Sequence, residues 1–172
     1  MPPRRGTSVV DGEHATLTFH RVYPHRIEHV WEAISTREGL SQWLMCTRAD
    51  IDARVGGHIE LITGPTAYHS TGRITAWQPP RLFEFEWNVA PLPEMPRGEN
   101  ALFRFELSPL ADGATRLVVT YLRITKQTAV GFLPGLHAFL DRLEAQLEGA
   151  TLPDWLQRFE ALRAEYPDWG GH

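Results

Sequence analysis

Five consecutive segments of alternating polar and apolar residues constrain the fold of this chain more than any other feature. They cover residues 52–62, 68–77, 81–89, 101–108 and 115–124. A period of two is typical of β-strands that bury one face. Turn-forming residues such as Pro79-Pro80 and Asp112-Gly113 separate the segments. Because these connections are too short for crossover helices, the strands are predicted to pair as antiparallel hairpins.

One face of the predicted sheet is strongly aromatic. Phe83, Phe85 and Trp87 share one side of their strand, whereas Glu84 and Glu86 share the other. Leaving such a face in water would forfeit about 25 cal/mol per Å² of apolar area. The sheet therefore needs a covering element.

The segment 130–149 is predicted to be that cover, as a long helix. Its leucines recur three or four residues apart, at positions Leu133, Leu136, Leu140, Leu143 and Leu147. Pro134 suits the first turn of this helix, and Gly149 suits its C-terminal end. The leucine stripe is therefore expected to lie on the aromatic face.

The remaining elements complete an α+β pattern. Residues 15–23 alternate as a first strand, and two short helices are predicted to follow it, ending near Trp43. Asp154 and Gln157 have capping-box spacing, which predicts a terminal helix docked on the domain or on a neighbour. We expect a curved six-stranded antiparallel sheet wrapped around a long C-terminal helix. Residues 1–14 are predicted to be a flexible N-terminus, 15–149 the domain, and 150–172 a helical extension.

Composition excludes several classes of function. The net charge of −4 and the pI of about 6.0 argue against a nucleic-acid partner. Cys46 is the single cysteine, which excludes an intrachain disulfide and favours a cytoplasmic location. No stretch of the sequence reaches the about 20 apolar residues of a membrane span.

Four short motifs resemble the SRPBCC or START-like superfamily, in particular its homologues of the activator of heat-shock-protein ATPase. They are Val30-Trp31-Glu32-Ala33-Ile34 with Gly39-Leu40-Ser41-Gln42-Trp43; Arg54-Val55-Gly56-Gly57; Gly72-Arg73-Ile74 with Pro79-Pro80-Arg81-Leu82 and Trp87; and Gly135-Leu136-His137-Ala138-Phe139-Leu140. The resemblance implies the helix-grip fold. It also implies a hydrophobic cavity between sheet and last helix, which different members use for lipids, polyketides or plant hormones.

Two departures from the family pattern bear on function. Many relatives have Gly-Trp at the start of the gripping helix, where this chain has Gly135-Leu136, and the smaller side chain is expected to widen the cavity. The eukaryotic co-chaperone has an additional N-terminal domain, and nothing comparable precedes Ala15. We therefore do not expect the co-chaperone role of the family name.

The candidate ligand-binding residues are mainly aromatic side chains of the inner face, because small-molecule pockets combine apolar walls with a few polar groups. They are Trp43, Tyr68, Trp77, Phe85, Trp87, Phe103, Phe105, Tyr121, Arg123, Phe132, Leu136, His137, Phe139 and Leu140. The alternative is that the aromatic residues only fill the core. His137 is the candidate acid or base if the protein is an enzyme, and Arg123 is a candidate partner for an anionic group.

Other suggestive patterns are interpreted as structural. His25 and His29 have helical spacing but no third ligand, so no metal site is predicted. Gly56-Gly57 lacks the residues of a phosphate loop and is interpreted as a bend in the sheet. Cys46 is expected to be a buried, inert thiol. No cofactor is predicted.

Three functions follow from these observations. The first is binding or sequestration of a hydrophobic small molecule. The second is a cyclase or dehydratase acting on a polyketide-type substrate, with His137 moving protons. The third is an interaction protein of the chaperone-activator type, which would expose Trp155, Phe159 and Leu162 on the terminal helix. A homodimer through a sheet edge or the terminal helix is left open.

Overall fold

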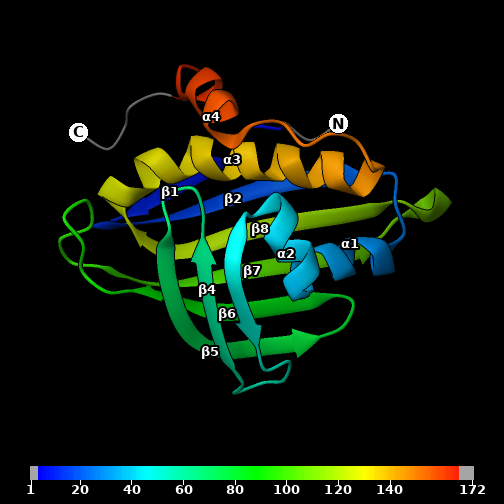
Figure 1. Cartoon of the computed structure of the whole chain (residues 1–172), viewed down its shortest axis with the longest axis horizontal. Coiled ribbons are helices and arrows are strands. Elements are labelled where there is room, and N and C mark those ends of the chain that lie inside the picture. Colours follow the sequence, from blue (N-terminus) through cyan, green and yellow to red (C-terminus); the bar gives the residue numbers. More distant parts are fainter. Residues whose placement is uncertain (1–3, 167–172) are drawn as a thin grey trace.

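Eight antiparallel strands form one curved sheet that wraps the long helix α3 (Figure 1). The strands are β1 (Thr7–Asp11), β2 (His14–Tyr23), β3 (Cys46–Ile51), β4 (His58–Thr63), β5 (Tyr68–Gln78), β6 (Leu82–Val89), β7 (Glu99–Pro109) and β8 (Thr115–Thr125), and the helices are α1 (Ile27–Ser35), α2 (Arg37–Trp43), α3 (Lys126–Glu148) and α4 (Trp155–Arg163). This computed structural model describes residues 4–166. The strand order is β1-β2-β8-β7-β6-β5-β4-β3.

The prediction of six strands is wrong, because β1 and β3 are also part of the sheet. β1 lies in the segment expected to be flexible and pairs with β2, with Val9 opposite Thr16. It carries no clear alternation, since Val9 and Val10 are both exposed. β3 pairs with β4 through Ala49 and Leu61. Both missed strands lie at the sheet edges, where burial imposes less hydrophobic patterning.

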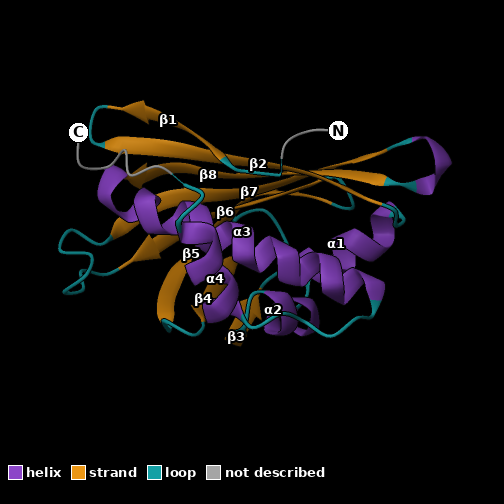
Figure 2. Ribbon diagram, turned by 90° about the horizontal axis from the view of Figure 1, so that it is seen from above, coloured by secondary structure: helices purple, strands orange, loops and turns teal. Residues whose placement is uncertain are grey.

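The helix-grip arrangement itself is confirmed. Phe85, Phe103 and Tyr121 pair across β6, β7 and β8, and this aromatic row lies on the buried face under α3. Figure 2 shows the helices gathered on one side of the sheet. Of the helices in residues 4–166, none is long and apolar enough to cross a membrane.

The gripping helix starts earlier than its leucine stripe predicts. It begins at Lys126, so Pro134 lies in its interior rather than in its first turn. A proline there cannot donate the usual intrahelical hydrogen bond. The predicted end is confirmed: Gly149 has a φ of 70°, and its N–H donates to carbonyls of the last turn. The predicted start of α4 is also confirmed, since the Asp154 carboxylate accepts from the Gln157 N–H at 2.9 Å.

Candidate functional site

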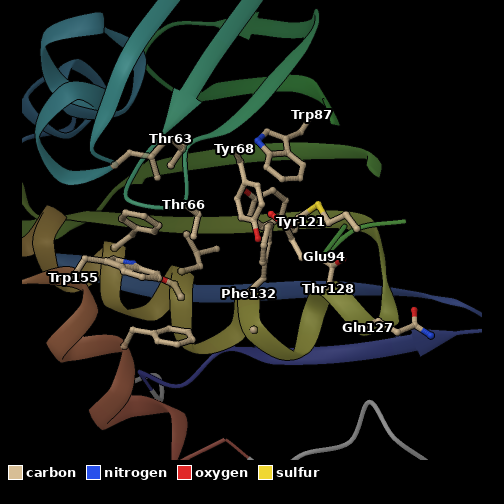
Figure 3. Close-up of a pocket in the computed structure, with 17 residues that line it drawn as sticks. Thr63, Thr66, Tyr68, Trp87, Glu94, Tyr121, Gln127, Thr128, Phe132 and Trp155 are labelled. Carbon is tan, nitrogen blue, oxygen red and sulfur yellow. The ribbon is translucent and has the colours of Figure 1, made fainter. Parts of the chain in front are cut away.

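A pocket of about 280 Å³ opens between α3, the sheet, the β6–β7 connection and α4 (Figure 3). We call it the main pocket. It is lined by Leu44, Thr63, Thr66, Tyr68, Trp87, Glu94, Met95, Tyr121, Gln127, Thr128, Gly131, Phe132, Gly135, Leu136, Phe139, Trp155 and Phe159. The cavity that the helix-grip resemblance implies is therefore present.

Two glycines on α3 help to explain why space remains beside this helix. Gly131 and Gly135 are four residues apart, so they lie near each other on the same side of the helix. A Cβ atom at Gly131 would meet no atom within 4 Å, and one at Gly135 would lie 3.5 Å from Cζ2 of Trp155. The Trp155 indole N–H donates to the Gly135 carbonyl at 3.0 Å. α4 therefore closes the side of the pocket that the glycines leave open.

Four rings from four different elements form the aromatic wall of the main pocket. They are Tyr68 of β5, Trp87 of β6, Tyr121 of β8 and Phe132 of α3. Their centroids lie 5.5 Å apart for Trp87 and Tyr121, 5.5 Å for Trp87 and Phe132, and 5.9 Å for Tyr68 and Phe132. Figure 3 shows these rings gathered between α3 and the strands. Because these ring planes are inclined to one another by 45–75°, an apolar molecule in the pocket can contact both ring faces and ring edges.

The polar groups of the pocket are mostly neutral. Burial raises the pKa of Tyr121 far above its ordinary value, and burial followed by the charge of Glu94 raises the pKa of Tyr68. Both hydroxyls are therefore protonated near neutral pH and can donate or accept hydrogen bonds. Of the described residues that line the main pocket, Glu94 alone carries a formal charge.

A second hollow of about 350 Å³ adjoins the main pocket and shares Glu94, Met95, Gln127 and Thr128 with it. We call it the side pocket. Arg123 lines it and is exposed, with a φ of 61°. Because that conformation is unfavourable for a residue with a side chain, the β8 backbone is strained at this point. The structure thus places Arg123 beside the predicted cavity, not in the main pocket.

The start of α3 is held in place by a buried carboxylate. Glu99 is 2% exposed and accepts hydrogen bonds from the Thr125 N–H at 2.8 Å and the Thr128 hydroxyl at 2.8 Å. These bonds engage both oxygens of the Glu99 carboxylate, which lines the side pocket but not the main pocket. They also fix the helix turn that carries Gln127 and Thr128 between the two pockets.

Six of the predicted ligand-binding residues line the main pocket: Tyr68, Trp87, Tyr121, Phe132, Leu136 and Phe139. The structure does not bring the others to it. Trp43, Phe85, Phe103, Phe105 and Leu140 are buried in the core, and Trp77 packs against Trp31 and Phe83 instead. The two-residue period predicts which face of a strand is buried, but it does not distinguish the part beneath the leucines of α3 from the part beside its glycines.

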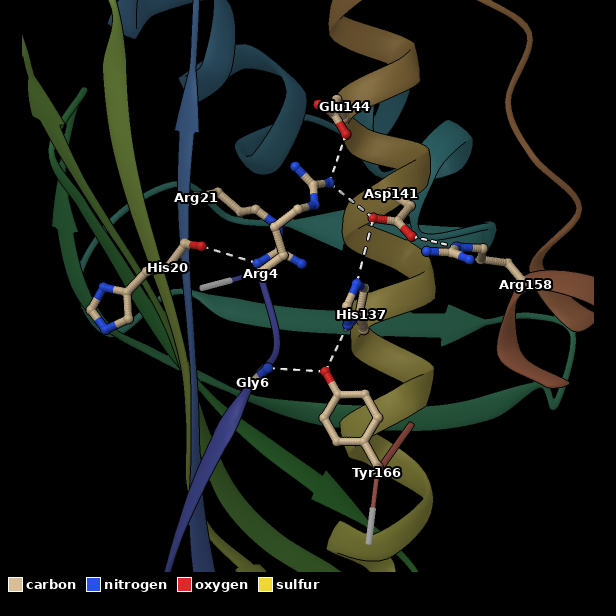
Figure 4. Close-up of polar contacts among 9 residues, drawn as sticks. All are labelled: Arg4, Gly6, His20, Arg21, His137, Asp141, Glu144, Arg158 and Tyr166. Atoms are coloured by element: carbon tan, nitrogen blue, oxygen red, sulfur yellow. Dashed lines mark hydrogen bonds and ion pairs between the residues drawn. The ribbon is translucent and has the colours of Figure 1, made fainter. Parts of the chain in front are cut away.

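His137 does not line the main pocket, and its imidazole lies between Tyr166 and Asp141 (Figure 4). Its Nδ1 is 2.6 Å from the hydroxyl of Tyr166, and that hydroxyl accepts from the Gly6 N–H at 2.9 Å. The Tyr166 proton is therefore directed to His137 Nδ1. Burial lowers the pKa of His137 to about 4, against the opposing effect of Asp141. His137 is thus a neutral structural residue at pH 7.

Asp141 links segments that are far apart in the chain. Its carboxylate is 3.1 Å from the guanidinium of Arg4 and 2.7 Å from that of Arg158, and the His137 imidazole lies 3.8 Å away. We refer to Arg4, His137, Asp141, Arg158 and Tyr166 as the terminal network. It ties the N-terminal segment and α4 to α3, as Figure 4 shows.

Sequence reasoning missed the contribution of α4 to the pocket. The interaction-protein alternative required Trp155 and Phe159 to form an exposed patch, and this is wrong, because Trp155 is 9% exposed and both rings line the main pocket. Leu162 is also buried. The pair Gly131 and Gly135 was the available signal, since two glycines on one side of a helix leave room for large rings of a neighbour.

The patterns interpreted as structural have ordinary surroundings. Within residues 4–166, no group of three or more His, Cys, Asp or Glu side chains is arranged to hold a metal ion. His29 donates through Nε2 to the Leu147 carbonyl at 3.2 Å. Cys46 is buried as predicted, and burial raises its thiol pKa to about 11.

The fold and the main pocket define a helix-grip protein of the START-like class. Solved structures share this fold over most of their length. CalU16 from Micromonospora echinospora is 20% identical, with 94% of this chain and 92% of that chain covered and a TM-score of 0.70. Protein MLL2253 from Mesorhizobium loti is 22% identical, with coverages of 80% and 99% and a TM-score of 0.68. A conserved protein of unknown function from Enterococcus faecalis, EF2215, is 17% identical, with coverages of 93% and 89% and a TM-score of 0.70.

The sequence pattern of one family, described as "Activator of Hsp90 ATPase homolog 1-like protein", matches residues 24–148. This match spans more than half of the chain, so the protein belongs to that family. A search among curated proteins finds no match.

Proposed function

We propose that this protein binds an apolar, aromatic small molecule in the main pocket. The observation that carries the proposal is the hollow of about 280 Å³ between the aromatic wall and α3. Ligand pockets typically measure about 300–1,000 Å³, so this one suits a compact ligand of two or three fused rings. Burial of the ligand against the rings would provide affinity, and the hydroxyls of Tyr68 and Tyr121 would orient it.

Binding is favoured over the cyclase or dehydratase alternative by the position of His137. The proposed acid or base is in the terminal network rather than at the main pocket. The tyrosine hydroxyls that do line the pocket hold their protons tightly. Such groups are suited to hold a ligand by hydrogen bonds rather than to remove a proton from it.

The interaction-protein alternative is not supported, because the apolar side of α4 that would form its binding surface is packed against α3. A homodimer through the sheet edge would use β1, which exposes Val9. A buried thiol as the single cysteine is compatible with the reducing cytoplasm, which we propose as the location.

Replacing Leu136 by tryptophan tests the proposed function. Leu136 lines the main pocket, so the larger indole should occupy ligand space. We expect Leu136→Trp to weaken binding of N-phenyl-1-naphthylamine, an uncharged dye that fluoresces in apolar surroundings, by about tenfold or more. A fluorescence titration measures this affinity, and circular dichroism with a melting curve checks that the variant is folded.

Leu156→Trp is the matched control, because it makes the same substitution at a residue of α4 that is 56% exposed and lies outside the lining. Its affinity for the dye should equal that of the wild type. A wild-type protein that does not bind the dye, or a folded Leu136→Trp variant that binds it normally, would contradict the proposed function.

A further inference from the structure

The charge of Glu94 gives the main pocket a definite electrostatic preference. Among residues 4–166, no side chain forms an ion pair or a hydrogen bond with the Glu94 carboxylate. The carboxylate lies close enough to Tyr68 for its charge to raise the pKa of that hydroxyl. The one formal charge at the pocket is therefore negative and available to a ligand.

The aromatic wall favours the same sign of charge. The faces of Trp and Tyr rings carry partial negative charge and attract cations within about 6 Å. Tyr68, Trp87 and Tyr121 all contribute to this wall, and Figure 3 shows Glu94 near the rings of Tyr68 and Tyr121. A positive group at this place would contact ring faces and a carboxylate together.

The nearby arginines do not reverse this preference. Arg97 is paired with Glu13 at 2.6 Å, and both Arg97 and Arg123 line the side pocket but not the main pocket. Glu94 lies in the wall that the two pockets share. An anionic group placed at this shared wall would be repelled by the Glu94 carboxylate.

We propose that the ligand of the main pocket is an aromatic molecule with an aliphatic amine, bound with its ammonium group between Glu94 and the rings of Tyr68 and Tyr121. The inference rests on the proposed function and specifies in addition that the ligand carries a positive charge. It predicts that a cationic ligand binds more tightly than a neutral one of the same shape, and a neutral one more tightly than an anionic one.

Three naphthalene derivatives of similar size test this order: 1-naphthylmethylamine, which is protonated at neutral pH, 1-naphthalenemethanol and 1-naphthoate. Their dissociation constants are measured by displacement of N-phenyl-1-naphthylamine. In the wild type we expect the amine to bind about threefold to tenfold more tightly than the alcohol, from one exposed carboxylate and the ring faces. The naphthoate should bind most weakly.

Glu94→Gln removes the charge while keeping the shape of the side chain, and Glu106→Gln is the control at an exposed glutamate on β7, outside the pocket. The ratio of alcohol to amine dissociation constants should fall at least about twofold in Glu94→Gln and stay unchanged in Glu106→Gln. An alcohol that binds as tightly as the amine, or a ratio that does not respond specifically to Glu94→Gln, overturns the inference and leaves the proposed function intact. If neither amine nor alcohol displaces the dye, or if the dye itself does not bind, the proposed function fails as well.

Discussion

His137 shows how burial determines the charge of a single residue. The side chain is 3% exposed, and its pKa of about 4 lies below the ordinary histidine value of about 6.5. Between these two values the unfolded chain takes up a proton that the folded protein does not bind. The contribution of His137 to the free energy of unfolding should therefore be fully present above about pH 6.5. It should be lost progressively as the pH falls toward 4.

His137→Gln should remove this part of the pH dependence. Glutamine offers the Tyr166 hydroxyl an acceptor but does not titrate. Between pH 7 and pH 5, we expect the wild type to lose roughly 1–2 kcal/mol more unfolding free energy than the variant. Urea denaturation at a series of pH values measures the difference. His20→Gln, at an exposed position on β2, should behave as the wild type, and an unchanged slope in His137→Gln would refute the assignment.

At the scale of one element, α4 is a separate layer that packs on α3 and not on the sheet, as Figure 1 shows. Its main anchor is Trp155, which stacks on Phe159 with centroids 4.9 Å apart and bonds to the Gly135 carbonyl. Because α4 forms no part of the hydrogen-bonded sheet, it can detach without breaking a strand pairing. Local release of α4 should therefore require much less free energy than global unfolding.

Trp155→Ala should release α4 selectively. Truncating a buried tryptophan costs about 3–5 kcal/mol, so the amides of α4 should exchange with solvent at least about a hundredfold faster. The amides of β6, β7 and β8 should keep their wild-type exchange rates. Hydrogen exchange followed by mass spectrometry resolves these segments. Leu156→Ala, at an exposed position of the same helix, should leave exchange unchanged. Equal acceleration in the sheet would show that α4 is not a separate unit.

At the scale of the whole molecule, the segment before β1 and helix α4 both contact α3 at Asp141. Arg4 lies before β1 and Arg158 lies in α4, yet both bind the Asp141 carboxylate, which is 12% exposed. Either arginine alone can still neutralise this mostly buried charge. Removal of both leaves it without a cation.

A double-mutant cycle measures this connection. Arg4→Ala and Arg158→Ala should each have a small effect, because both guanidinium groups are partly exposed. The double variant should lose more stability than the sum of the single changes, by about 0.5–1 kcal/mol. Urea denaturation of the four proteins provides the comparison, with Arg163→Ala in place of Arg158→Ala as the control. Additive losses would mean that the ends of the chain are energetically independent.

The sequence by itself determined the properties that depend on local periodicity and local hydrogen bonding. Alternation in the segments around Phe85 and Phe103 predicted the sheet, the leucines predicted the gripping helix, and Gly149 and Asp154 predicted helix ends that the structure confirms. It also indicated the aromatic residues that the sheet and α3 contribute to the pocket, but not Trp155 and Phe159 of α4. These features can be predicted from the sequence because each depends only on one element and on the residues next to it in the chain.

Only the tertiary structure decided which aromatic residues face empty space and which fill the core. Phe103 and Tyr121 pair side by side in the sheet, yet Tyr121 lines the main pocket and Phe103 does not. The physical reason is that periodicity selects a face of an element, whereas a cavity depends on what packs opposite each point of that face. For the same reason, the sequence alone did not show that Glu94 and Trp155 line the pocket. Their positions there depend on how α3 packs against the sheet and α4.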